Sequence, residues 1–368
     1  MAIAYAIADC DYRGVTMTDF LANAYPTLAK HLDKLVFAEL PTPVGEKIVS
    51  LAGSNHTISI KYDNLTSSFY GGNKLRKLEY LLRGALARNV GRVATFGTAA
   101  SNHVLATALY AKQLDLPCTC LTSHQVRTAA AVRTLRLLLA NGAEIVRYGG
   151  SYHSRIETMR RHVQGRNIYL IPIGGSSWLG TVGYVNAGLE LAAQITALEI
   201  PAPDRIYIAT GTMGSAAGLA LGLALAGQES QVQAVRVSPE IIMNRRRLDH
   251  LTIKTATMLS RIDASIPADL ASHALIEVRH EFFGDGYAVS NSATDAAVEL
   301  ASGQLGLDLE PTYTGKAMAA LLYDLAQSEH AGKSMLFWNT YNSNPLPDPD
   351  DTAIDLDRLP AEFLRYFD

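Results

Sequence analysis

The segment Arg205-Ile-Tyr-Ile-Ala-Thr-Gly-Thr-Met-Gly-Ser-Ala-Ala-Gly218 places an apolar run, a turn of small residues and a helical pattern in direct succession. Small residues at a helix N-terminus expose backbone N–H groups to an anion, and the hydroxyls of Thr212 and Ser215 can add hydrogen bonds. The segment lacks the Gly-Lys-Ser/Thr of a P-loop and the spacing of a GxGxxG fingerprint. It therefore predicts a phosphate-binding turn. Close packing of a helix on a strand is the alternative explanation of the same small residues.

The alternation of strand and helix extends in both directions from this segment, beginning at about residue 70. Apolar, β-prone runs are expected at 92–96, 117–121, 144–148, 168–171, 205–209 and 233–237. Helical patterns lie between and beside them, at about 75–88, 101–114, 128–141, 152–164, 182–197, 215–227 and 241–257. This order predicts an α/β fold, with parallel sheets covered by helices. Gly and Ser cluster where strands lead into helices, which is the edge where such sheets bind ligands.

A second informative stretch is Gly71-Gly72-Asn73-Lys74. Two glycines allow positive φ and a close approach of the backbone to a ligand. Asn73 is a favoured N-cap residue, so we expect it to cap the helix that follows and to place Lys74 in the first turn. The helix dipole disfavours a cation there, and a lysine that loses its proton easily can form a Schiff base with an aldehyde. The alternative is a glycine-rich turn with a solvated lysine.

Two further clusters follow predicted strands. In the segment 97–103, Ser101 and Asn102 fall at the start of a helix, where capping is the simpler explanation. In the segment 309–318, Tyr313 offers a phenol and Thr314 a neutral hydroxyl, and a turn with an N-cap is again the alternative.

Composition narrows the class of protein. The chain has 368 residues, a net charge of -3 and 18% charged residues, which predicts a soluble protein of about two domains. The longest basic run, Arg245–Arg247, is too short to suggest nucleic-acid binding. The apolar run 216–226 is too short to span a membrane and is expected to be a buried helix. Three cysteines give neither a disulfide framework nor a metal site, and the N-terminus lacks a basic secretory region, so we expect a cytoplasmic protein without a bound metal.

Taken in order, the motifs of the chain resemble those of the pyridoxal-phosphate enzymes of the tryptophan synthase β-like fold (fold type II). Within that fold the chain is similar to the D-cysteine desulfhydrase and 1-aminocyclopropane-1-carboxylate deaminase family. The resemblance covers about residues 38–325 and is carried by Leu40–Pro43, Lys61–Asn64, Gly71–Glu79, Ser101–His103, Ile173–Ser176, Gly183–Val185, the glycine-rich turn 210–218 and Tyr313–Met318. It implies two domains, each an open, mostly parallel sheet covered by helices: a large cofactor-binding domain of residues 1–77 and 186–368 and a small domain of residues 78–185. It also implies pyridoxal 5'-phosphate as cofactor, a small amino acid as substrate and a homodimer.

The resemblance also implies roles for individual residues. Lys74 would form the Schiff base with the cofactor, and Asn102 would hydrogen-bond the cofactor's phenolic oxygen. Ser101 would lie by the substrate carboxylate or act in proton transfer. Tyr313 and Tyr287 would lie in the active site beside the ring and the substrate. The phosphate would be held by Gly211, Thr212, Met213, Gly214 and Ser215, and Thr314 would face the pyridine nitrogen.

Thr314 helps to choose between the two activities. The deaminases of the family have Glu at this position, and a carboxylate there keeps the pyridine nitrogen protonated and the ring a strong electron sink. A threonine suits a reaction that expels a good leaving group such as a thiolate. We therefore expect a lyase that converts D-cysteine to pyruvate, hydrogen sulfide and ammonia, with Lys74 as the base that removes the α-proton. The alternatives are the deaminase, elimination from another β-substituted amino acid, and a ligand-binding homologue without catalysis.

The chain departs from the family's pattern in three places. Ser177, followed by Trp178, stands where the family has Asn, and residues 338–343 (Trp-Asn-Thr-Tyr-Asn-Ser) replace a His-Thr-Gly-Gly segment that usually lies near the cofactor. An extension of about 35 residues precedes Leu40. The second departure predicts a substrate pocket that differs from that of the family.

Overall fold

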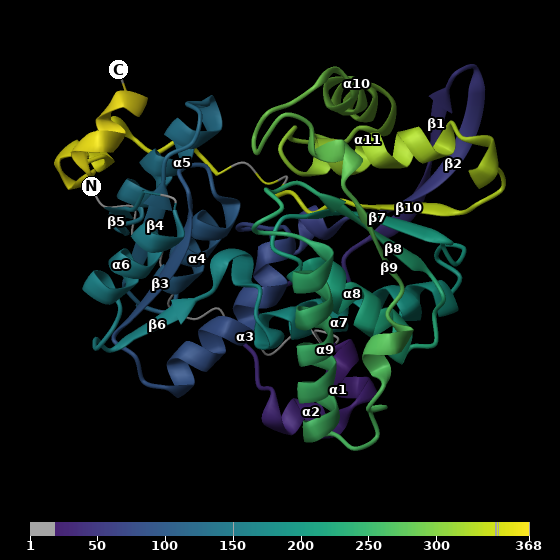
Figure 1. The fold of residues 1–368 in the computed structure, drawn as a ribbon, viewed down its shortest axis with the longest axis horizontal. Coiled ribbons are helices and arrows are strands. Elements are labelled where there is room, and N and C mark those ends of the chain that lie inside the picture. Colours follow the sequence, from purple (N-terminus) through teal and green to yellow (C-terminus); the bar gives the residue numbers. More distant parts are fainter. Residues whose placement is uncertain (1–18, 150, 343, 345, 368) are drawn as a thin grey trace.

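The structure is a computed structural model that describes residues 19–149, 151–342, 344 and 346–367. It contains two separate sheets (Figure 1). The larger has the order β1 (Val44–Leu51), β2 (Ser54–Lys61), β10 (Met335–Trp338), β7 (Arg205–Thr210), β8 (Gln231–Arg236) and β9 (Ile276–Arg279). The smaller has the order β5 (Glu144–Arg147), β4 (Cys118–Ser123), β3 (Arg92–Thr98) and β6 (Ile168–Ile171). Every pairing is parallel except that of β1 with β2, so the predicted α/β fold is confirmed.

Helices cover both sheets (Figure 1). The longer ones are α3 (Asn73–Ala87), α4 (Asn102–Lys112), α5 (Ala129–Ala140), α6 (Tyr152–His162), α7 (Trp178–Thr196), α8 (Gly214–Leu225), α9 (Arg245–Ile262), α10 (Ser292–Leu300) and α11 (Thr314–Leu325). Two short helices, α1 (Phe20–Ala24) and α2 (Pro26–His31), precede them. The pattern missed the first turn of α7, which begins earlier than expected because the Ser177 side chain accepts a hydrogen bond from the backbone N–H of Gly180.

The expected buried helix at 216–226 is α8, and its composition follows from its packing. The helix lies backbone to backbone against α7, since a Cβ added to Gly218 would come within 2.4 Å of the carbonyl oxygen of Thr181. Larger residues would separate the two helices, which explains the run of Gly and Ala. Among the described residues, no helix is both long and apolar enough to cross a membrane.

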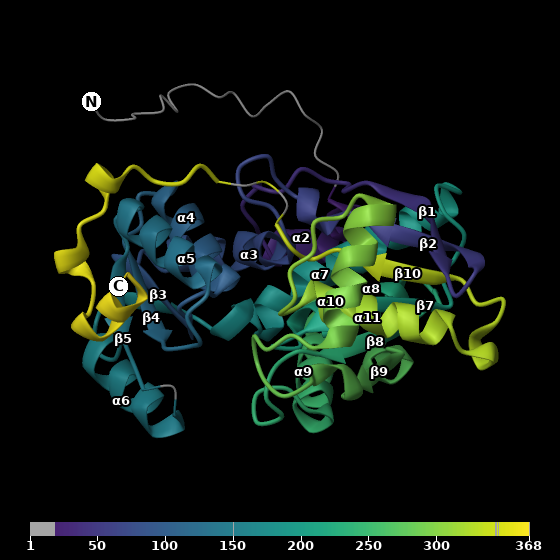
Figure 2. The same ribbon diagram turned by 90° about the horizontal axis from the view of Figure 1, so that it is seen from above.

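The predicted domain boundaries, 77/78 and 185/186, fall inside α3 and α7. These two helices pack on each other, and a Cβ on Gly183 of α7 would lie 2.0 Å from the carbonyl oxygen of Arg76 on α3. The division into domains stays a prediction. After β10 the chain returns to the smaller sheet, and its last described turn (Ala361–Tyr366) contributes Phe363 and Tyr366 to the core beside α5 (Figure 2). These contacts support a smaller unit that also includes the C-terminal segment.

Candidate active site

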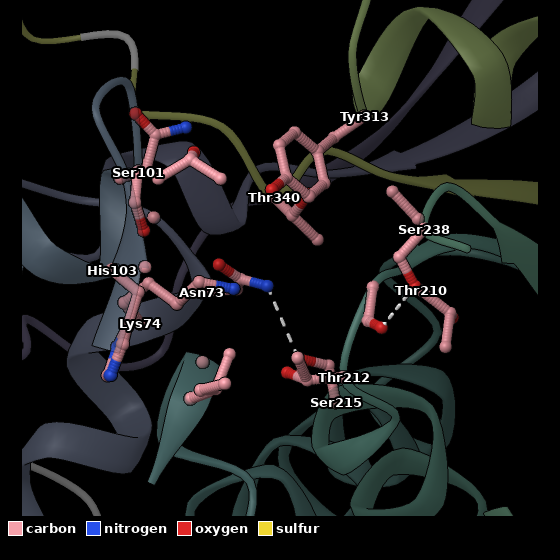
Figure 3. Close-up of a pocket in the computed structure, with 18 of the residues that line it drawn as sticks. Asn73, Lys74, Ser101, His103, Thr210, Thr212, Ser215, Ser238, Tyr313 and Thr340 are labelled. Atoms are coloured by element: carbon pink, nitrogen blue, oxygen red, sulfur yellow. Dashed lines mark hydrogen bonds between the residues drawn. The ribbon is translucent and has the colours of Figure 1, made fainter. Parts of the chain in front are cut away.

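A cavity of about 290 Å³ lies between the two sheets, at the carboxyl ends of β3 and β7. Figure 3 shows Lys74, Ser101 and His103 on one wall and Thr212, Ser215 and Ser238 on the opposite wall, with Tyr313 between them. The structure brings most of the predicted site residues to this cavity: Lys74, Ser101, Asn102, Gly211, Thr212, Met213, Ser215, Tyr287 and Tyr313. Gly214 and Thr314 are not among its lining residues.

Lys74 is the second residue of α3, but the helix is not capped as expected. The N-cap is Gly72, with a φ of 93°, and a Cβ at this position would lie 2.9 Å from the carbonyl oxygen of Thr340. Only glycine meets both conditions without strain. The prediction that Asn73 is the N-cap is therefore wrong. The Asn73 side chain instead donates to the Ser215 hydroxyl at 3.2 Å and joins the start of α3 to the start of α8 (Figure 3).

Lys74 and Lys77 lie one helical turn apart at the start of α3, and both line the cavity. Burial lowers the pKa of Lys74 to about 8, although the charge of Glu310 opposes the shift. Burial, and then the charge of Lys74, hold the pKa of Lys77 well below its usual range. The Lys77 amine donates to the carbonyl oxygen of Gly174 at 3.3 Å. The sequence interpretation gave Lys77 no role, although its spacing of three residues from Lys74 puts both side chains on one helix face.

The glycine-rich turn forms a polar cup at the N-terminus of α8. Met213 is the N-cap of α8 with a φ of 69°, an uncommon conformation for a side-chain-bearing residue that recurs at functional sites. The Ser176 hydroxyl contacts the Thr212 hydroxyl at 2.9 Å and accepts from the backbone N–H of Gly214 at 3.1 Å. A Cβ on Gly214 would lie 3.0 Å from the Lys77 amine. A helix N-terminus, hydroxyl groups and a nearby amine are features that can hold an anion such as a phosphate.

Two tyrosines line the cavity beside the cup, since a Cβ on Gly211 would lie 3.4 Å from the Tyr313 ring. The hydroxyl oxygens of Tyr287 and Tyr313 are 2.6 Å apart, and the rings meet edge to face. Burial raises the pKa of Tyr287, and burial together with the nearby Tyr287 raises the pKa of Tyr313 well above its usual range. Both phenols are therefore neutral proton donors at physiological pH.

Ser101 and His103 lie at the start of α4. Ser101 is both a cap and a cavity residue, because its hydroxyl accepts from the backbone N–H of Val104 at 3.3 Å and also lines the wall. The Thr95 hydroxyl donates to the carbonyl oxygen of Ile171, so it accepts from Nε2–H of His103 at 3.0 Å. No hydrogen bond to Nδ1 of His103 is present among the described residues, although a backbone contact with Pro172 favours a protonated ring. Burial and the two lysines hold the pKa of His103 well below its usual range, so the ring is neutral.

A carboxyl group that the sequence interpretation missed lines the cavity near Thr314. The Thr314 side chain is fully buried, and its hydroxyl accepts from the backbone N–H of Glu310 at 3.1 Å. Glu310 reaches the cavity and accepts from the backbone N–H groups of Thr312 and Tyr313 at 2.7 and 2.8 Å. Burial raises the pKa of Glu310 against these hydrogen bonds. An acidic residue just before a helix start was the available signal.

The segment that departs from the family pattern lies at the cavity, as expected. Thr340, Tyr341 and Asn342 line it, and Ser343 lies outside the described residues. The Asn342 side chain accepts from the backbone N–H of Gly71 at 2.8 Å, and the carbonyl oxygen of Thr340 accepts from that of Asn73 at 3.1 Å. This segment therefore holds the turn that presents Lys74. Within the described residues, His, Cys, Asp and Glu form no cluster that could hold a metal ion.

The chain is similar to known proteins over most of its length. Residues 36–340 match the family described as pyridoxal-phosphate dependent enzyme. A curated D-cysteine desulfhydrase of Salmonella choleraesuis (strain SC-B67) is 34% identical over 309 residues, which cover 81% of this chain and 90% of the relative. The crystal structure of an ACC deaminase homologue has a TM-score of 0.69 at 26% identity, covering 89% of this chain and 95% of that one. A hydrogen sulfide-producing enzyme from Fusobacterium nucleatum shares the fold, with a TM-score of 0.56 at 18% identity over 92% of this chain and 93% of that one.

Proposed function

Since the chain belongs to the family of pyridoxal-phosphate-dependent enzymes, as its motifs predicted, we propose that it is a lyase acting on D-cysteine. With one water molecule, D-cysteine is converted to pyruvate, hydrogen sulfide and ammonia. The observation that carries the proposal is the position of Lys74, whose amine has a lowered pKa and whose helix begins beside an anion-binding cup. The curated D-cysteine desulfhydrases that the chain resembles over most of its length support the choice of substrate.

The residues of the cavity fit the cofactor. The cup formed by Gly211, Thr212, Met213, Gly214 and Ser215 would hold the phosphate, with Lys77 as a nearby amine. Asn102 would hydrogen-bond the phenolic oxygen, and Lys74 would bind the aldehyde carbon. When bound, the cofactor supplies an electron sink for the pair of electrons left when the α C–H bond breaks.

The remaining steps are assigned to side chains of this cavity. Lys74, as a free amine, removes the α-proton, and a pKa of about 8 keeps a useful fraction of the amine unprotonated near neutral pH. The Ser101 hydroxyl hydrogen is free to bind the substrate carboxylate, because the oxygen rather than the hydrogen serves the helix cap. The neutral pair of Tyr287 and Tyr313 can donate a proton to the departing sulfur.

A second candidate is 1-aminocyclopropane-1-carboxylate deamination. Thr314 was expected to argue against it, but its side chain is fully buried and does not line the cavity, so it does not decide between the two activities. The observation in its favour is the carboxyl group of Glu310, which lines the cavity and precedes Thr314 by four positions in the chain. The likeness to the ACC deaminase homologue supports keeping this alternative.

The experiment is an assay of the purified, cofactor-loaded protein on D-cysteine, L-cysteine and 1-aminocyclopropane-1-carboxylate, with sulfide, pyruvate and 2-oxobutyrate measured. We expect sulfide and pyruvate from D-cysteine, lost in Lys74→Ala by at least about a thousandfold because both the covalent attachment and the base are removed. Lys47→Ala, a change at an exposed lysine, should leave the rate unchanged. Formation of 2-oxobutyrate would favour the deaminase, and sulfide from L-cysteine alone would overturn the proposed stereochemistry.

We extend the proposal to assembly and location. A homodimer is expected by family resemblance, and a monomer in sedimentation velocity would contradict it. The absence of a spanning helix in the described residues and the free, buried thiols of Cys118 and Cys120 support a cytoplasmic enzyme. Fractionation that places the protein outside the cytoplasm would contradict this location. The charge balance gives no support for a nucleic-acid partner.

A further inference from the structure

A C-terminal segment links the larger sheet to the smaller one. The family match ends at residue 340, and residues 346–367 then run from the larger sheet to the smaller one (Figure 2). We call residues 346–367 the C-terminal strap. Two ion pairs connect the strap to α5, between Arg133 and Asp348 at 2.7 Å and between Arg136 and Asp351 at 2.5 Å. Both pairs are exposed, so each contributes little to the free energy that holds the strap in place.

The far end of the strap is anchored by buried aromatic rings. Phe363 and Tyr366 are 0% and 1% exposed, and both rings contact the imidazole of His124. The Tyr366 hydroxyl donates to the carbonyl oxygen of Gln125 at 2.6 Å and accepts from the backbone N–H of the same residue at 3.0 Å. One phenol thus satisfies both backbone groups of a residue in the irregular loop 124–128, which leads from β4 to α5.

The same loop supports the active-site wall. The Gln125 side chain accepts from the backbone N–H of Ala100 at 3.1 Å, and the carbonyl oxygen of Ser123 accepts from that of Ala99 at 3.1 Å. Ser123 itself lines the cavity, and Ala100 directly precedes Ser101. A continuous path of hydrogen bonds therefore leads from Tyr366 through Gln125 to the residue beside Ser101.

We propose that Tyr366 is a positioning residue, and that the C-terminal strap uses it to hold loop 124–128 and, through Gln125, the turn that presents Ser101. Without the phenol hydroxyl, Gln125 loses the partners of its backbone and moves more freely. The backbone N–H of Ala100 then loses a fixed acceptor, and the turn at residues 99–101 opens more often. The effect on catalysis rests on the proposed function, while the effect on loop mobility does not.

The test is Tyr366→Phe in the full-length, cofactor-loaded protein. The substitution removes the hydroxyl and keeps the ring in contact with His124 and Phe363. We expect amide hydrogen exchange to accelerate by about fivefold or more in peptides covering 98–103 and 123–127, because each lost hydrogen bond weakens closure by about that factor. Tyr152→Phe is the matched control, since Tyr152 is 65% exposed on α6 of the same unit and should leave both peptides unchanged.

Kinetics on D-cysteine give the second readout. Because Ser101 is assigned to the substrate carboxylate, we expect KM to rise several-fold in Tyr366→Phe with a smaller change in kcat. Faster exchange confined to 346–367, with unchanged peptides 98–103 and unchanged KM, would mean that Tyr366 only anchors the terminus and would overturn the proposal. If the wild-type protein does not consume D-cysteine, the proposed function fails, and the exchange measurement still decides the role of Tyr366.

Discussion

Lys74 illustrates how one side chain takes its chemistry from its place in an element. It lies in the first turn of α3, where burial lowers the pKa of its amine to about 8. At pH 7 a pKa of about 8 leaves about a tenth of the amine neutral, a few hundred times more than for an ordinary lysine. The neutral amine is the form that attacks an aldehyde and removes a proton.

The rate at which the cofactor-free protein takes up pyridoxal phosphate covalently should therefore follow this pKa. We expect the rate to rise about tenfold per pH unit below pH 8 and to level off above it, because only the unprotonated amine reacts. Stopped-flow absorbance on the wild type and on Lys47→Ala, the exposed-lysine control, would measure it. A rate that continues to rise to pH 10 would show that the amine keeps its ordinary proton affinity.

At single positions, the sequence predicted best where a local motif carries the function. Lys74, Ser101 and the turn before α8 all reach the cavity, although the roles assigned to them stay predictions. An acidic residue before a helix was the local signal for Glu310, but which of Glu310 and Thr314 reaches the cavity depends on how the turn before α11 closes on itself. The cap of α3 was misassigned for a related reason. The carbonyl oxygen of Thr340, distant in sequence, requires glycine at position 72.

The helices α3 and α7 are joined by a buried network of charges. Glu190 on α7 accepts from Lys61 of β2 at 2.6 Å and from Arg76 of α3 at 2.8 Å, and Arg76 also donates to Asp63 at 2.7 Å. All four side chains are almost completely buried. Burial alone would raise the pKa of Glu190, but the two cations outweigh it and lower the pKa to about 2. Because Arg76 follows Lys74 by two residues, the network also fixes the helix that presents the reactive amine.

Replacing Glu190 with glutamine should destabilise the protein by about 3–5 kcal/mol, since two buried cations would keep only one anionic partner. Denaturant unfolding of the cofactor-free protein would measure the loss. Glu157→Gln removes an exposed ion pair with Arg161 and should cost less than about 1 kcal/mol. A small effect at Glu190, equal to that of the control, would contradict a structural role for the network.

The free energy of unfolding of the wild type and that of Glu190→Gln should also depend differently on pH in acid. The folded-state pKa of Glu190 lies below the ordinary value of 4.5, so its stabilisation is present above about pH 4.5 and is lost as the pH falls toward 2. The wild type should therefore lose stability over this range more steeply than Glu190→Gln.

Secondary structure was predicted well where strand and helix alternate, because strands buried on both faces and amphipathic helices leave clear patterns. The patterns missed the antiparallel hairpin β1–β2 and the short strands β9 and β10. The hairpin turns at Ala52 and Gly53, a pair without the usual Asn-Gly signal, and β9 and β10 have four residues each. Length alone is not the reason, because β5 and β6 are equally short and were predicted between helical patterns, whereas β9 and β10 are defined by their neighbours in the sheet.

At the scale of the whole molecule, contacts between distant segments decide the architecture. β10 pairs with β2 and β7, which precede it by more than a hundred residues, and the C-terminal strap returns to the smaller sheet. No local pattern encodes such pairings, so the sequence could not predict that the last residues pack beside α5. The two sheets meet at the cavity, whose walls come from α3 and α4 on one side and from β7 and α8 on the other.

Removal of the cofactor should therefore loosen both walls. A ligand that binds only the folded protein stabilises it by about 2.7 kcal/mol at a hundred times its Kd, so the cofactor-free protein should unfold at a lower temperature and recover on reloading. In hydrogen exchange, peptides covering 97–103 and 210–216 should both lose protection, because Asn102 and the cup are assigned to opposite ends of the same ligand. The exposed helix α6 lines no part of the cavity and provides the internal control. Loss of protection at 210–216 alone would mean that the phosphate cup binds independently of the smaller sheet, and the assignment of Asn102 to the cofactor would fail.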